Sequence, residues 1–160
     1  MEHEGLIDTL NELIAINKDR IEGYKKATRE LSGEDVIRKG TLKTIEERIN
    51  ESQVFINELS GAVLRLGGKP HHHTTPRGKL YRMWMDLKTT ITGPTTKTIL
   101  ELCEYGEDAI LKTYQQVLTR QNGWPQEISH MLTRQEQILN QARETIKKCV
   151  NEMTSLKDSK

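Results

Sequence analysis

The amino-acid sequence predicts an all-α protein built as a bundle of four long helices. Apolar residues recur at alternating spacings of three and four along four segments, which is the pattern of helices that bury one face. Of the 160 residues, 29% are charged and 4% aromatic, and four are proline. That composition is nearer to long amphipathic helices than to a β-sandwich or a doubly wound α/β enzyme. The length suits one domain, residues 1–160.

The first helix is predicted over residues 5–31 and the second over about 35–66. Ser32 and Gly33 should end the first, since glycine readily adopts the left-handed conformation that closes a helix. Gly67 and Gly68 should end the second. The buried face of the first helix is Leu6, Leu10, Leu13, Asn17, Arg20, Tyr24, Ala27 and Leu31. That of the second is Leu42, Ile45, Ile49, Ser52, Ile56, Leu59, Val63 and Leu66.

A third helix is predicted from Thr96 to a stop at Asn122 and Gly123, and a fourth with Pro125 in its first turn. The third buries Ile99, Cys103, Gly106, Ile110, Thr113 and Val117, with Leu100, Glu107 and Tyr114 beside them. The fourth buries Ile128, Leu132, Gln135, Leu139, Ala142, Ile146, Cys149, Met153 and Leu156. Residues 157–160 should fray.

The connection between the second and third helices, residues 67–95, decides the predicted topology. Neighbouring antiparallel helices need only about 2 to 8 connecting residues, so this segment should bridge a longer distance. Leu80, Trp84, Leu87 and Ile91 predict a short fifth helix over about residues 78–91. A connection that returns along the bundle produces the up-down-down-up order of ferritin-like four-helix bundles.

Three segments together resemble a known bacterial family. They are NELIAINKDRIEGY at residues 11–24, GKLYRMWMDLK at 78–88 and CEYGEDA at 103–109. In order and spacing they are similar to the family named domain of unknown function 2383, which is placed among the ferritin-like proteins. The Gly-Glu-Asp at residues 106–108 is the most specific piece. The resemblance implies a ferritin-like fold and a bacterial, cytoplasmic origin, and it provides no mechanism.

Polar side chains interrupt the apolar faces near mid-length. They are Asn17, Arg20, Ser52, Glu107, Tyr114 and Gln135. A buried polar group without a partner costs about 1 to 3 kcal/mol, so we expect these groups to bond to one another, with Arg20 paired to Glu107. The first hypothesis is a structural network that fixes helix register. The second is a remnant or unconventional metal or small-ligand site that uses Glu51, Glu104 and Glu107.

The histidines do not encode the usual metal site of this fold. Ferritin-like proteins that hold two metal ions use a Glu on each of two helices and a Glu-x-x-His on each of the others. Here only Glu127 to His130 matches, in the first turns of the fourth helix, and we interpret it as a chance match. His71, His72 and His73 could chelate a metal ion, but neighbouring loop side chains rarely converge on one ion, so a solvated loop is the preferred interpretation.

Composition and motifs limit the function further. The net charge of +1 disfavours a nucleic-acid binder, and no apolar run approaches the roughly 20 residues of a membrane span. Cys103 and Cys149 lie at helical core spacing and predict buried thiols. No phosphate loop, nucleophile elbow or catalytic triad is present.

We therefore expect a cytoplasmic, non-enzymatic protein of binding or assembly, with no assigned cofactor and no identified protein partner. Analogy with ferritin-like bundles, which associate along helix faces, favours a homo-oligomer. The alternative is a metal-dependent protein, oxidase-like or metal-storing. It would hold iron, manganese or zinc with bundle carboxylates, with Tyr24 or Tyr114 nearby.

Overall fold

The computed structural model describes residues 3–31, 36–71 and 96–158. These residues form four helices: α1 (Glu4–Glu30), α2 (Val36–Arg65), α4 (Thr96–Thr119) and α5 (Gln126–Asp158). Each lies where the apolar periodicity predicts a helix. The short helix predicted over 78–91 and the predicted stop at Ser32 and Gly33 lie outside the described residues. No helix in the described ranges is both long enough and apolar enough to cross a membrane.

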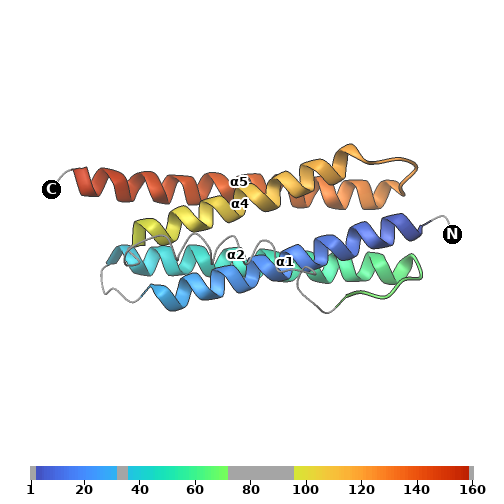
Figure 1. Ribbon diagram of the computed structural model, residues 1–160, viewed down its shortest axis with the longest axis horizontal. Coiled ribbons are helices and arrows are strands. Elements are labelled where there is room, and N and C mark those ends of the chain that lie inside the picture. The colour runs from blue at the N-terminus through green and yellow to red at the C-terminus, as the bar shows by residue number, and fades with distance from the viewer. Residues whose placement is uncertain (1–2, 32–35, 72–95, 159–160) are drawn as a thin grey trace.

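The helices form two antiparallel hairpins that lie side by side (Figure 1). The α1 helix packs mainly on α2, and α4 mainly on α5. The hairpins meet through α1 and α4, and less closely through α2 and α5. Because α2 and α4 run in the same direction, α2 ends and α4 begins at opposite ends of the bundle (Figure 1). This is the predicted up-down-down-up order.

Glycine ends α2 as the sequence predicts. Gly67 has φ +85°, in the left-handed region. The Gly68 N–H donates to the Val63 carbonyl at 2.9 Å, and the Gly67 N–H donates to the Leu64 carbonyl at 3.0 Å. These bonds satisfy carbonyls that the last helical turn would otherwise leave unpaired. A Cβ on Gly68 would lie 2.7 Å from Ile7 Cγ2, so this turn packs closely against the start of α1.

The connection between α4 and α5 differs slightly from its predicted form. The α4 helix ends at Thr119, before Asn122 and Gly123, although Gly123 does adopt a left-handed φ of +69°. Pro125 precedes α5 instead of lying in its first turn, and its carbonyl accepts the N–H groups of Ile128 and Ser129. Proline suits this place because its fixed φ is compatible with helix entry and it has no N–H to leave unpaired.

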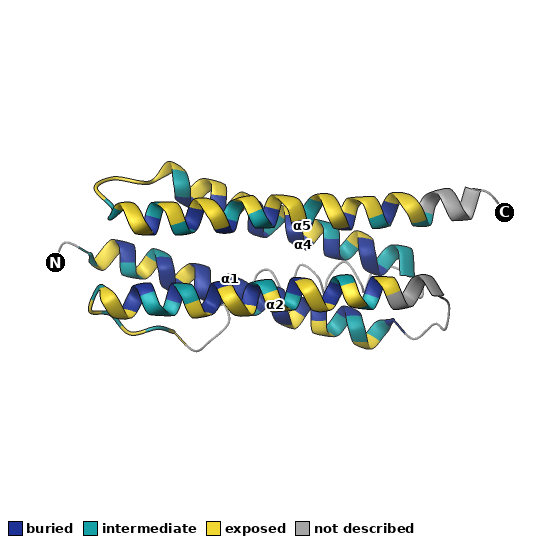
Figure 2. Cartoon of the chain, turned by 180° about the vertical axis from the view of Figure 1, so that it is seen from behind, coloured by how far each residue is buried: buried dark blue, intermediate teal, exposed yellow. Residues whose placement is uncertain are grey.

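The buried side chains lie on the faces that the helices turn toward one another (Figure 2). In α1 the predicted face is buried throughout, and Cys103 is buried in α4 as predicted. The α2 helix is rotated slightly from its prediction, because Leu42, Ile49 and Leu66 are only partly buried. Side chains that the prediction left out are buried instead: Thr41, Arg48, Phe55 and Ala62. Near the end of α5, Val150 is buried and Cys149 only partly so.

A buried polar layer as the candidate functional site

A layer of polar side chains crosses the apolar core near mid-length. All the predicted members are fully buried, with no exposed surface, and all four described helices contribute: Asn17, Arg20, Ser52, Glu107, Tyr114 and Gln135. They lie at positions of the buried faces, so the helical periodicity that buries leucine elsewhere also carries these groups inward. The predicted buried polar network is therefore present.

Arg20 is the centre of this layer. Its Nε donates to Glu107 Oε1 at 2.8 Å, and its Nη2 donates to Glu107 Oε2 at 3.1 Å, which makes the expected ion pair bidentate. Nη2 also donates to Glu51 Oε1 at 3.1 Å. Nη1 donates to Ser52 Oγ at 2.9 Å and to the Arg48 carbonyl at 3.2 Å. All five guanidinium N–H groups thus have an oxygen acceptor.

The charges inside this cluster balance. Burial, the largest single influence, opposes the charged form of Arg20, but Glu107 and the other partners of the guanidinium together outweigh it and raise its pKa. Glu51 also accepts from Arg48 Nε at 2.8 Å, so inside the protein two carboxylates face two guanidinium groups, and a third acid, the largely exposed Glu47, pairs with Arg48 at the surface. Each buried charge is therefore paired with an opposite charge and hydrogen-bonded, which is the condition under which buried charges are tolerated.

Tyr24 completes the shell of Glu107. Its hydroxyl donates to Glu107 Oε1 at 2.5 Å, and its ring lies 5.6 Å from the guanidinium carbon of Arg20. Burial, followed by the nearby carboxylate charge, raises the pKa of Tyr24 well above its ordinary value. The tyrosine therefore stays protonated and keeps its hydrogen for Glu107.

A second arm of the network runs from Ser52 across to α5. Ser52 Oγ donates to Asn17 Oδ1 at 2.8 Å, and Asn17 Nδ2 donates to the Tyr114 hydroxyl at 2.9 Å. That hydroxyl donates in turn to Gln135 Oε1 at 2.7 Å, and Gln135 Nε2 donates to Glu58 Oε1 at 3.1 Å. Burial raises the pKa of Tyr114, so its hydroxyl also remains a donor.

A shallow groove opens beside the layer between α2 and α5. Its volume is about 440 Å³, and its lining combines charged and apolar side chains: Glu47, Arg48, Asn50, Glu51, Val54, Phe55, Arg134 and Ile138. The side chain of Glu51 is 22% exposed while that of Arg20 is 0% exposed. Glu51 thus links the groove to the buried guanidinium.

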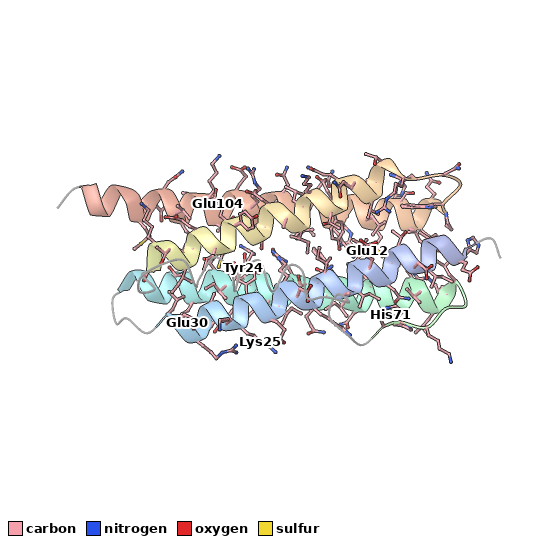
Figure 3. All side chains as sticks on the ribbon, in the orientation of Figure 1. Glu12, Tyr24, Lys25, Glu30, His71 and Glu104 are labelled. Carbon is pink, nitrogen blue, oxygen red and sulfur yellow. The ribbon has the colours of Figure 1, made fainter. Side chains whose placement is uncertain are left out.

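Two of the metal-ligand candidates, Glu51 and Glu107, converge on one nitrogen of Arg20, Nη2. Glu107 and Glu51 are both bonded to Arg20, and Glu104 lies on α4 toward the opposite end of the bundle from His71 (Figure 3). His71 is exposed, and His72 and His73 lie outside the described residues. Within the described ranges no three His, Cys, Asp or Glu side chains are grouped so as to hold a metal ion. The described residues do not fit the carboxylate-bridged metal pair of this fold, because the Arg20 guanidinium already engages Glu51 and Glu107.

The Glu-x-x-His of α5 points away from the core. Glu127 and His130 are exposed, whereas Ile128 and Leu132 are buried, which agrees with a chance match. The backbone at His71 has a structural partner instead. Its N–H donates to Asn11 Oδ1 at 2.9 Å, and its carbonyl accepts from Lys18 Nζ at 3.0 Å. These contacts tie the chain leaving α2 to α1.

Sequence reasoning did not single out two members of the network, Arg48 and Glu58, and it placed Tyr24 on the buried face without assigning it to the polar layer. Arg48 precedes Glu51 by three residues, a spacing that pairs side chains on a helix surface and could have drawn attention to it. Glu58 gave no comparable signal, because its partners Gln135 and Arg134 lie on a different helix.

Comparison with solved structures supports the fold. A Dps1 mutant from Mycobacterium smegmatis matches with a TM-score of 0.73 and 12% identity over 91% of this chain and 95% of that one. A protein described as ferritin-like and diiron-carboxylate, from Bacillus anthracis strain Ames, matches with a TM-score of 0.58 and 18% identity over 96% and 95%. At these identities the likeness is one of fold.

No curated protein matches the sequence significantly. The model of the domain of unknown function DUF2383 matches residues 6–120, which is most of the chain. The buried Gly106 and Glu107 that carried the resemblance lie within that match. With its ferritin-like arrangement of helices and this match, the chain belongs to the DUF2383 family.

Proposed function

We propose that this protein is a non-enzymatic bundle that acts through binding or assembly, and that its polar layer serves structure. The observation that carries the proposal is the saturation of Glu107. Both carboxylate oxygens accept from Arg20, and Oε1 also accepts from Tyr24. A carboxylate engaged in this way has little capacity left to act as a metal ligand or as a base.

The direction of the contacts supports a role in register. Arg20 and Tyr24 on α1 reach Glu107 on α4, and Asn17 on α1 reaches Tyr114 on α4. Each of these bonds crosses from one hairpin to the other. Sliding the hairpins by one turn, about 5.4 Å, would leave charged groups buried without partners. The layer therefore disfavours alternative packings that an apolar core alone would tolerate.

Metal analysis tests the proposal directly. The full chain is purified without a nickel column and its iron, manganese and zinc are measured, together with its thermal midpoint before and after chelation. We expect no stoichiometric metal and an unchanged midpoint. The matched variants are Glu107→Ala and Glu104→Ala, which remove one carboxylate inside the layer and one outside it. Stoichiometric metal in the wild type that is lost in Glu107→Ala would establish the metal-storing or oxidase-like alternative, and its loss in Glu104→Ala as well would show that both carboxylates hold the ion.

Self-association forms the second part of the proposal. Ferritin-like bundles present long helix faces that can pack against a second copy, and this analogy of fold supports a homo-oligomer. Sedimentation equilibrium at micromolar protein concentration measures the mass. A mass that stays at one chain across the concentration range would overturn this part and leave the structural role of the layer untouched.

A further inference from the structure

We propose that Arg20 is the resident cation of an oxygen-lined site at the centre of the bundle, and that shortening its side chain opens this site to a free guanidinium-type cation. The inference goes beyond the proposed function, because it assigns a ligand chemistry to the layer. In ferritin-like carboxylate proteins the core position is held by metal ions. Here the chain supplies the positive charge itself.

The first support is the composition of the shell. Every atom that accepts a hydrogen bond from the Arg20 guanidinium is an oxygen, and the acceptors come from both hairpins: Glu107 Oε1 and Oε2, Glu51 Oε1, Ser52 Oγ and the Arg48 carbonyl. Most are held by further bonds. Tyr24 donates to Glu107, Arg48 Nε donates to Glu51, and Ser52 bonds Asn17. A shell braced in this way should keep much of its shape when the cation is removed.

The distances favour guanidinium over a metal ion. The five nitrogen–oxygen distances lie between 2.8 and 3.2 Å, which suits N–H···O hydrogen bonds. Divalent metals bind oxygen at about 2.0 to 2.6 Å and would have to draw both carboxylates inward. Glu107 is also held by Tyr24, and Glu51 by Arg48, and both contacts oppose that movement.

The charge points to a monovalent ion. Arg20 and Arg48 balance Glu51 and Glu107 in the intact cluster, and Glu47, the other acid paired with Arg48, is largely exposed to water. Without Arg20 the cluster carries one uncompensated negative charge in a buried place. A monovalent cation restores neutrality, whereas a divalent one leaves a buried excess of positive charge. Glu51, which also lines the groove between α2 and α5, provides the side from which a small ion can enter.

The test is rescue of Arg20→Ala by guanidinium chloride at low millimolar concentration, far below the molar concentrations at which it denatures proteins. Thermal midpoints are measured for the wild type and the variant across the titration, with sodium chloride as the ionic control. We expect a saturable rise in the midpoint of Arg20→Ala and none in the wild type. Ethylguanidinium, which resembles the missing end of the side chain more closely, should act at lower concentration.

A double variant, called the shell control, tests whether the charge of Glu107 is needed for binding. Arg20→Ala combined with Glu107→Gln removes the negative charge that the ion neutralises, so guanidinium should leave its midpoint unchanged. If Arg20→Ala does not fold alone, recovery of helical circular dichroism during the titration replaces the midpoint as the readout. The proposal fails if guanidinium has no effect on Arg20→Ala in either readout, or if it stabilises the wild type or the shell control equally.

A metal titration of the same variant separates the two ligand chemistries. Stabilisation of Arg20→Ala by manganese, calcium or zinc without any response to guanidinium would overturn the assignment to a guanidinium site. The outcome is independent of the proposed function, which is tested by metal content in the wild type, where Arg20 is present.

Discussion

The seam between α1 and α4 and the seam between α2 and α5 both join the two hairpins through polar side chains, but water reaches them differently. At the first seam, Arg20, Tyr24 and Glu107 are completely buried. At the second, the side chains of Glu58 and Arg134 are 29% and 48% exposed, and they lie beside an open groove. Similar chemical groups therefore bond in two environments.

The difference shows which contacts hold the hairpins in register. A buried charge that loses its partner costs several kcal/mol, whereas an exposed one is solvated by water. We call the buried seam between α1 and α4 the closed seam and the partly exposed seam between α2 and α5 the open seam. The closed seam should determine how the hairpins dock, and the open seam should tolerate substitution. The denser packing of α1 on α4 than of α2 on α5 agrees with this division.

The largest effect is expected for Glu107→Ala, which breaks the closed seam. Arg20 would keep its charge but lose both bonds to its bidentate partner, so we expect the free energy of unfolding to fall by about 3 to 5 kcal/mol. Urea denaturation followed by circular dichroism measures this. Glu104→Ala, on the same helix but outside the layer, is the control. A loss of similar size in both variants would contradict a special role for the buried pair.

Alkaline pH should weaken the same seam through its tyrosines. Tyr24 and Tyr114 have raised pKa values in the folded protein, whereas in the unfolded chain tyrosine ionises near the ordinary value of about 10. Their stabilising contribution is present below that value and is lost as the pH rises toward the folded pKa. Each tyrosine should contribute a slope of roughly 1.4 kcal/mol per pH unit above about pH 10.

Unfolding free energies measured between about pH 9 and 11 test this expectation. Tyr24→Phe and Tyr114→Phe should each show a shallower decline than the wild type, because phenylalanine cannot ionise. Tyr105→Phe removes a tyrosine that is 46% exposed and is the matched control. Identical slopes in all four proteins would show that the decline comes from other groups, such as lysines.

A smaller effect is expected for Tyr114→Phe at neutral pH. The substitution keeps the ring but removes the hydroxyl that bonds Asn17 and Gln135. Two buried amides would each lose a partner, so we expect a loss of about 1 to 3 kcal/mol, measured by urea denaturation. Tyr105→Phe should change the stability little. If neither variant loses stability, the hydrogen bonds from Ser52 across to α5 do not stabilise the fold.

The smallest effect is expected for Arg134→Ala at the open seam. Its ion pair with Glu58 is partly exposed, so we expect a loss of only about 0 to 1 kcal/mol that shrinks as salt is added. Unfolding measured at low and high ionic strength checks this. A loss as large as that of Glu107→Ala would show that the two seams do not differ as we argue.

The candidate site was partly predictable from the chain. The spacing of Asn17 and Arg20 in α1 places both inside, because buried positions recur every three or four residues whatever their side chain. Charge then suggests Glu107 as the partner of Arg20. Arg48 and Glu58 escaped prediction, since a long side chain near the edge of a helix face can turn inward or outward, and its spacing does not distinguish the two.

The residue pattern alone settles which stretches are helical, which face of α1, α4 and α5 is buried, and that the core contains polar groups. Only the folded arrangement decides which of those groups meet. Arg48 and Ile49 are separated by about 100° around α2, so one of them can lie at each edge of the buried face. A rotation of the helix by part of that angle therefore buries Arg48 and partly exposes Ile49. Periodicity describes each helix separately, whereas the five bonds of Arg20 depend on the rotation and axial register of three helices at once.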